Sequence, residues 1–190
     1  MSSPEPGGAN AHAPTLLDVA RRSIEHGLRA GAPLPVDPAT FAPALREPRA
    51  TFITLQRNGR LRGCVGSLQA RLPLVADVAQ SAFAAAFRDT RFAPLGPAEA
   101  DGLEIHISIL SPLEPLVVAS EAELLATLRP GVDGLVLCEG ALRGTFLPAV
   151  WERLPDARQF VEELKRKAGL QGDYWSPTLE LQRYTVESIS

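Results

Sequence analysis

The sequence predicts an α+β fold in which mainly antiparallel sheets pack against helices. Two hairpin signals support this prediction: strand-like segments flank Asn58-Gly59, and a second pair of strand-like segments flanks Gly140. Asn-Gly is a strong signal for a two-residue type I′ turn, and such turns join antiparallel strands. Segments with apolar residues at helical spacing lie between the hairpins. This order favours an α+β fold over a doubly wound parallel sheet.

Length and composition indicate a soluble globular protein. The 190 residues fit one domain or two small joined subdomains, and 45% of them are hydrophobic against 22% charged. The net charge of −3 provides no basic surplus of the kind that nucleic-acid binders carry, so we expect no nucleic-acid partner. The sequence has no apolar run of about 18 residues and no visible signal sequence. We therefore expect a cytoplasmic protein that does not contact a membrane.

The first elements follow from caps and composition. Residues 1–14 are rich in Ser, Pro, Gly and Ala, which predicts a flexible tail ahead of a single domain over residues 15–190. Thr15 is expected to cap the first helix, and Gly31 to end it. A proline-rich loop follows over residues 32–48.

The first hairpin places the most unusual segment of the chain in its second strand. Its strands are expected over residues 51–56 and 61–68. A regular two-residue turn would put Cys64 opposite Ile53, on an apolar face that Arg62 would share, unless a glycine introduces a bulge.

The remaining chain continues the alternation of helices and strands. A helix opened by Pro73 is expected to end near Arg88, and strands are expected over 103–110 and, briefly, over 116–119. A helix over 121–128 and a hairpin with strands over 135–139 and 141–147 follow. The last elements are a helix after Pro155-Asp156 that Gly169 caps and a strand over 179–186. Within the strand over 103–110, isoleucines alternate with polar residues, which indicates one buried face.

Cys64 is the strongest candidate for chemistry. It lies between Gly63 and Gly66, and glycines in a strand indicate close backbone approach or unusual dihedral angles. A thiolate is a strong nucleophile, Arg62 can supply a positive charge beside it, and the glycines leave backbone N–H groups open to an anionic group. The alternative is a small buried hydrophobe packed opposite Ile53.

His106 is a weaker catalytic candidate. It lies on the polar side of the strand over 103–110 and can act as a general base for Cys64 if the two strands are adjacent. The alternative is ordinary polar alternation on a solvent-exposed sheet face.

Asp89 and Arg91 follow the helix that Pro73 opens, and they fit either an ion pair or a substrate contact at the rim of a cleft. Cys138 is expected to be a buried strand residue. Neither the two cysteines nor the three histidines have the spacing of a metal site, and no phosphate-binding glycine motif occurs. We therefore expect no metal and no cofactor.

Several ordered blocks resemble the AMMECR1 family, over about Leu16 to Thr185. The segment Leu61-Arg62-Gly63-Cys64-Val65-Gly66 is similar to the family signature Leu-Arg-Gly-Cys-Ile-Gly, with Val65 in place of Ile. Further blocks are similar to Asp-x-Arg-Phe at Asp89-Thr90-Arg91-Phe92, to Pro-Gly-x-Asp-Gly at Pro130-Gly131-Val132-Asp133-Gly134, and to Phe-Leu-Pro-Gln-Val at Phe146-Leu147-Pro148-Ala149-Val150.

The resemblance implies an α+β protein of two intimately joined subdomains that form a cleft, with the signature near their junction. It also implies association with Memo-like and radical-SAM proteins, which are often encoded beside bacterial and archaeal relatives. The family has further been linked to RNA.

These observations predict an enzyme or enzyme subunit that acts on a small-molecule or protein substrate. Arg62, Cys64, Asp89 and Arg91 would lie near its cleft. The alternatives are a non-catalytic adaptor that presents this cleft to a partner protein, and an RNA-modification or RNA-binding factor.

Overall fold

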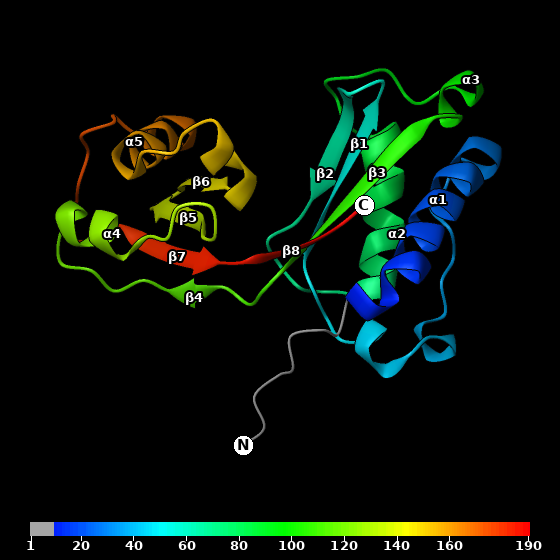
Figure 1. Cartoon of the computed structure of the whole chain (residues 1–190), viewed down its shortest axis with the longest axis horizontal. Coiled ribbons are helices and arrows are strands. Elements are labelled where there is room, and N and C mark those ends of the chain that lie inside the picture. The colour runs from blue at the N-terminus through cyan, green and yellow to red at the C-terminus, as the bar shows by residue number, and fades with distance from the viewer. Residues whose placement is uncertain (1–9) are drawn as a thin grey trace. The chain divides into compact units, whose positions relative to one another are not determined.

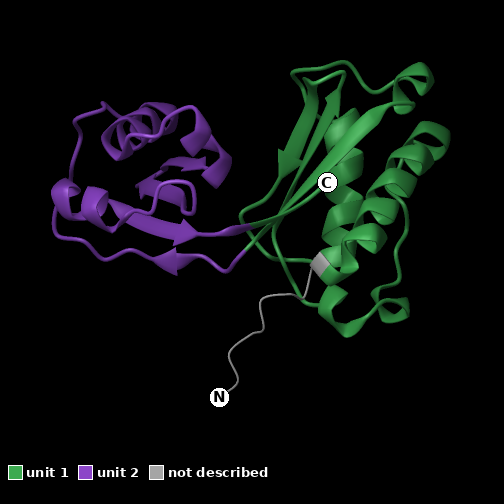
Figure 2. Cartoon of the chain, in the orientation of Figure 1, with its two compact units in different colours: residues 1–110, 187–190 green, residues 111–186 purple. Residues whose placement is uncertain are grey.

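A computed structural model describes residues 10–190, and the chain divides into two compact units (Figure 2). Unit 1 comprises Met1–Leu110 and Glu187–Ser190, and unit 2 comprises Ser111–Val186. Residues 1–9 of the predicted flexible tail lie outside the described residues. The rest of that tail is helical, because a 3₁₀ turn over Asn10–His12 leads directly into the first α-helix.

Unit 1 contains a four-stranded sheet in the order β2-β1-β3-β8. Its strands are β1 (Thr51–Arg57), β2 (Arg60–Gly66), β3 (Leu103–Leu110) and β8 (Val186–Ile189). The central strand β1 pairs antiparallel with both β2 and β3, which leaves β2 at an edge of the sheet.

Two long helices cover one face of this sheet (Figure 1). They are α1 (Ala13–Ala30) and α2 (Leu74–Phe87), and a single turn, α3 (Pro97–Ala100), precedes β3. Helix α1 starts earlier than predicted: Thr15 is not its cap, because Pro14 in the first turn and the preceding 3₁₀ turn extend the helix backwards. Gly31 ends the helix as predicted, in the left-handed conformation with φ 66°.

The core of unit 1 lies between the sheet and the helices. Alternate residues of β1 and β3 enter it, and Ile53, Leu55, Ile107 and Ile109 are completely or almost completely buried. Because the side chains of a strand alternate between faces, Thr54 and His106 lie on the opposite face of the sheet, away from α1 and α2. That face carries two of the candidate residues described below, Cys64 and His106.

Unit 2 contains a second sheet, in the order β4-β7-β5-β6. Its elements are β4 (Glu114–Pro115), α4 (Glu121–Thr127), β5 (Gly134–Glu139), β6 (Leu142–Phe146), a 3₁₀ helix (Pro148–Glu152), α5 (Ala157–Ala168) and β7 (Glu180–Tyr184). Paired strands with assigned registers run antiparallel, which confirms the predicted α+β class. The core of unit 2 is separate, and its centre is a stack of Trp151 on Phe160 with ring centroids 3.8 Å apart.

Two strand predictions in this region were wrong. The strand expected over residues 116–119 is absent, and β4 instead covers the two residues before it. Val117 is almost fully exposed there, so its β-branched side chain packs against no sheet. The strand expected over residues 179–186 is two strands, β7 and β8, which belong to different sheets.

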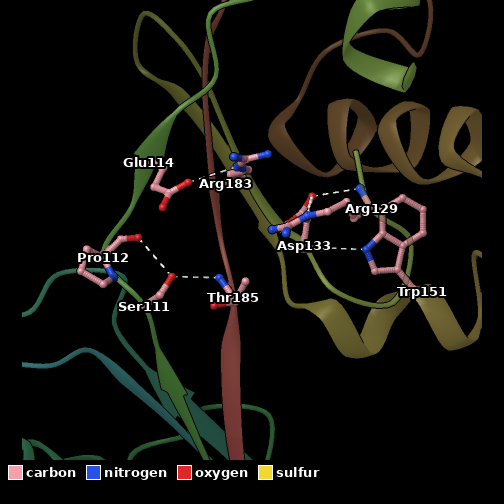
Figure 3. A network of polar contacts seen from close by, with 8 residues as sticks. All are labelled: Ser111, Pro112, Glu114, Arg129, Asp133, Trp151, Arg183 and Thr185. Atoms are coloured by element: carbon pink, nitrogen blue, oxygen red, sulfur yellow. Dashed lines mark hydrogen bonds and ion pairs between the residues drawn. The ribbon is translucent and has the colours of Figure 1, made fainter. Parts of the chain in front are cut away.

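The Pro-Gly-x-Asp-Gly turn of unit 2 is built around a buried carboxylate (Figure 3). Asp133 accepts hydrogen bonds from the guanidinium of Arg129, one of them 2.6 Å long, and its carbonyl accepts one from Trp151 Nε1 at 2.7 Å. In the same view, Thr185 N donates to Ser111 Oγ at 2.9 Å. The contacts of Asp133 are sufficient to explain this turn as structure.

Among the described helices, none is both long and apolar enough to cross a membrane.

Candidate functional site

A bulge in the first hairpin decides where Cys64 points. Gln56 pairs with Leu61, but the next residue, Leu55, pairs with Gly63, so Arg62 is the extra residue of β2. The regular register, which places Cys64 opposite Ile53, is therefore wrong. Cys64 lies opposite Thr54, on the sheet face that points away from α1 and α2.

The glycines of the signature serve the protein's own packing. Gly63 takes the inward position opposite Leu55, where an added Cβ would collide with the carbonyl of Ala85 in α2. At Gly66, an added Cβ would collide with the backbone of β1 at Thr51. Both positions thus require glycine for close backbone approach, one of the two explanations that the sequence offered.

Cys64 is half-buried, and its side chain and backbone have different partners. Its Sγ lies 3.3 Å from Thr54 Oγ1, close enough for a hydrogen bond in either direction. Its backbone N–H donates to Asp89 Oδ2 at 2.8 Å. The Cys64 amide, which the sequence predicts to be open to an external anion, is therefore occupied by a carboxylate of the same chain.

Asp89 and Arg91 form a pair that occupies the backbone groups of Cys64 at the free edge of β2. Arg91 donates to the Asp89 carboxylate through Nε at 3.0 Å and Nη2 at 2.7 Å, and Nη2 also lies 3.4 Å from the Cys64 carbonyl oxygen. The hydrogen bonds from Arg91, assisted by the Cys64 N–H, hold the pKa of Asp89 far below its usual range despite burial. Capping of edge groups by side chains is a common protection of edge strands.

Arg62 is held by Glu99 in α3. Its Nε and Nη2 donate to the two carboxylate oxygens at 2.7 and 2.9 Å, while Nη2 also donates to the Ala93 carbonyl at 2.9 Å. The hydrogen bonds between Arg62 and Glu99 raise the pKa of Arg62 and, with a further bond from Gly96 N, lower the pKa of Glu99 to about 2. The ring of Phe92 lies within 5.8 Å of the Arg62 guanidinium and within 5.5 Å of that of Arg91.

His106 does not lie beside Cys64. Both residues pair with Thr54, but from opposite sides, because β1 separates β2 from β3. Two strand spacings put the backbones of Cys64 and His106 roughly 10 Å apart. The adjacency on which the general-base prediction depended is not met. His106 Nε2 is buried without a hydrogen-bond partner among the described residues.

The structure thus separates the predicted site residues into two groups. Cys64 and His106 share one sheet face with Thr54, whereas Arg62, Gly63, Gly66, Asp89 and Arg91 hold the backbone of β2 in place.

Sequence reasoning missed two of the participants. Thr54 would have been found if the bulge had been assigned to Arg62, since the bulge alone decides which residue of β1 faces Cys64. Glu99 is 37 positions away from Arg62, and no local pattern marks it as the partner.

The second cysteine was also assigned to the wrong environment. Cys138 is half-buried in β5 and not fully buried as predicted. Across the described residues, no three His, Cys, Asp or Glu side chains are grouped so that they could hold a metal ion.

Comparison with known proteins supports the resemblance seen in the sequence blocks. The family model AMMECR1 matches residues 17–189. A protein from Methanothermobacter thermautotrophicus is 36% identical over 179 residues, which cover 91% of each chain. A protein from Thermotoga maritima is 34% identical over 168 residues, which cover 87% of this chain and 91% of the relative.

A solved structure is similar over the same range. The crystal structure of the uncharacterized protein PH0010 from Pyrococcus horikoshii matches with a TM-score of 0.83 and 32% sequence identity, covering 92% of this chain and 88% of that one. The signature strand, the turn blocks, the fold and these matches lead to one conclusion: the chain belongs to the AMMECR1 family.

Proposed function

We propose that the protein is an enzyme or enzyme subunit that uses the thiol of Cys64 on a small or protein-borne substrate. One observation carries this proposal: the bulge at Arg62 turns Cys64 out of the core and puts its Sγ 3.3 Å from the Thr54 hydroxyl. A cysteine kept only for packing would gain more on the inward face, where Gly63 lies.

The neighbours of Cys64 have distinct roles in this proposal. The Thr54 hydroxyl can donate a hydrogen bond to the sulfur once the thiol has lost its proton. His106 would act only through a water molecule or a substrate group, because Thr54 lies between it and Cys64. Asp89 and Arg91 fix the Cys64 backbone and are positioning residues.

The test compares two thiols of similar exposure. Cys64 and Cys138 are both half-buried strand residues, so Cys138 is a matched control. We expect iodoacetamide to alkylate Cys64 at least about tenfold faster at neutral pH, because thiol reactivity follows the local environment of the sulfur. Mass spectrometry of the two tryptic peptides measures both rates. Thr54→Val should reduce the rate at Cys64 and leave the rate at Cys138 unchanged.

Two results would contradict the proposal. Equal alkylation rates would assign no special reactivity to Cys64. A large loss of melting temperature in Cys64→Ser would indicate a packing role, since this substitution keeps the size and the contact with Thr54.

A non-catalytic adaptor is the second candidate. It is favoured by the engagement of Arg62, Asp89 and Arg91 with their own chain, which leaves these side chains with a structural role. Its partners would be the Memo-like and radical-SAM proteins that the family resemblance suggests. Co-purification from the native host with Cys64→Ser, read together with the alkylation rates, separates the candidates: a partner retained by a chain whose Cys64 reacts no faster than Cys138 indicates an adaptor.

A further inference from the structure

Unit 1 contains a pocket of about 410 Å³ that does not include Cys64. It lies between the end of β2, where Val65, Gly66 and Ser67 line it, and the side of α2. Its volume is within the range of small-molecule sites in proteins. Since neither Cys64 nor Thr54 lines it, the pocket is distinct from the proposed thiol site.

The pocket is elongated along α2. Asp77, Ser81, Ala84 and Arg88 line it, and their spacing of four, three and four residues places them on one stripe of the helix. From Asp77 to Arg88 this stripe extends about 16 Å, at 1.5 Å per residue. Arg71 precedes the helix and Arg88 directly follows its last residue, so the Cα atoms of these two arginines lie at opposite ends of α2.

Both arginines are exposed and line the pocket. Neither guanidinium has a hydrogen bond or an ion pair within the described part of the chain, and that of Arg88 lies 5.0 Å from the ring centre of Phe83, another lining residue. Arginine is well suited to bind carboxylate or phosphate groups, because its planar fork can donate two parallel hydrogen bonds.

One buried acid opposes this positive charge. Asp77 is 7% exposed, and its Oδ2 accepts a hydrogen bond from Thr51 Oγ1 at 2.6 Å. Burial raises the pKa of Asp77 above its usual value, while the bonds from Thr51 lower it. With two arginines against one carboxylate, the pocket has a net positive charge and favours anions over cations.

We propose that this pocket binds an elongated small molecule that carries an oxyanion group, carboxylate or phosphate, at each end. Arg71 binds one end and Arg88 binds the other, while the body of the molecule lies against Val65, Leu72 and Phe83.

An extended peptide added to the sheet is a poorer match to this site. The exposed edge of β2 would have to offer a row of free backbone groups to such a strand. Asp89 and Arg91 already occupy the N–H and the carbonyl oxygen of Cys64. The pocket is therefore better suited to a ligand that binds to side chains, above all to the two arginines, than to one that pairs with the backbone of β2.

Binding can be measured by calorimetry on the full chain with two series of probes. Unbranched dicarboxylates from four to ten carbons and alkane bisphosphates of similar lengths distinguish the two kinds of oxyanion. We expect affinity in at least one series to rise with chain length. Arg71→Gln and Arg88→Gln should each weaken the best probe on the order of tenfold, because each removes a charged hydrogen bond. Arg60→Gln is the matched control, since the Arg60 side chain is exposed, has no hydrogen bond or ion pair among the described residues and lies outside the pocket.

Asp77→Asn provides a change in the opposite direction. It removes the opposing charge and keeps an acceptor for Thr51, so it should strengthen binding severalfold. Damage to the fold would weaken binding in all three pocket variants, so a rise in Asp77→Asn also shows that the pocket is intact. The proposal is overturned if no probe binds, if both arginine variants match Arg60→Gln, or if only one of them weakens binding.

Discussion

Glu99 and Arg62 illustrate how a bulged residue is held in place. The bulge gives Arg62 no partner residue on β1, and its guanidinium is instead fixed by the two carboxylate oxygens of Glu99. Arg62 is only 13% exposed, so loss of Glu99 would leave a largely buried cation with one remaining backbone acceptor, Ala93. This pair thus supports the bulge on which the orientation of Cys64 depends.

The Glu99–Arg62 pair predicts that wild type and Glu99→Gln differ in stability by an amount that depends on pH. Hydrogen bonds from Arg62, then from Gly96 N, lower the pKa of Glu99 from 4.5 to about 2. A carboxyl group whose pKa is lower in the folded state than in the unfolded state stabilises the folded state at pH values above its unfolded-state pKa. This stabilisation is lost as the pH falls through the folded-state pKa. Glu99→Gln should therefore lower the free energy of unfolding by about 1 kcal/mol at pH 7. The difference from wild type should shrink between roughly pH 5 and pH 2.

Urea denaturation at several pH values measures this difference. Glu25→Gln controls for the loss of one negative charge, because Glu25 is exposed and has no ion-pair partner in the described residues. A gap between wild type and Glu99→Gln that stays constant down to pH 2 would show that the carboxylate charge does not stabilise the bulge.

The candidate residues could be found from the sequence, but their roles could not. Gly63, Cys64 and Gly66 were singled out because glycines are rare in strands. The sequence predicts the bulge only as an alternative. A bulge shifts the register by one residue and so moves every following side chain to the other sheet face, and no local sequence pattern specifies whether this shift occurs. The partnership of Asp89 with the Cys64 amide joins residues 25 positions apart, which a pattern in one sequence does not reveal.

At the level of elements, β2 lies directly against α2 at Gly63. Gly63 sets this contact, because the space for its missing side chain is filled by the Ala85 carbonyl. Predictions of helices are confirmed where apolar residues at helical spacing lie between capping residues, as in α5 between Asp156 and Gly169. The strand expected over 116–119 is wrong, because the pairing with β7 begins earlier, at Glu114, and continues only to Leu116, whose N–H donates to the Leu181 carbonyl at 2.8 Å.

Gly63→Ala tests this contact. The added methyl group must push β2 away from α2, so the free energy of unfolding should fall by about 3 kcal/mol. Gly59→Ala is the control: Gly59 has φ 71° and open space around it, so only backbone strain of about 1 kcal/mol is expected. Urea denaturation compares the two variants. Equal losses would show that the sheet and helix adjust freely at Gly63.

At the level of the whole molecule, the chain contains two separate cores. The core of unit 1 is aliphatic and is built from β1, β3, α1 and α2, whereas that of unit 2 centres on the Trp151–Phe160 stack. None of the residues that the structure describes belongs to both clusters. Proteins often open in cooperative parts that coincide with such units, and each part then has its own free energy of opening.

Substitutions in the two cores should therefore have separable effects. Phe160→Ala removes a fully buried ring and should destabilise unit 2 by about 4 kcal/mol, while Ile107→Ala should destabilise unit 1 by about 3 kcal/mol. Hydrogen exchange followed by mass spectrometry measures the result. Phe160→Ala should accelerate exchange in peptides from residues 111–186 and leave those from β1 and α2 near their original rates, with the reverse pattern for Ile107→Ala. Uniform acceleration over the whole chain in either variant would instead show that the two cores unfold in a single cooperative step.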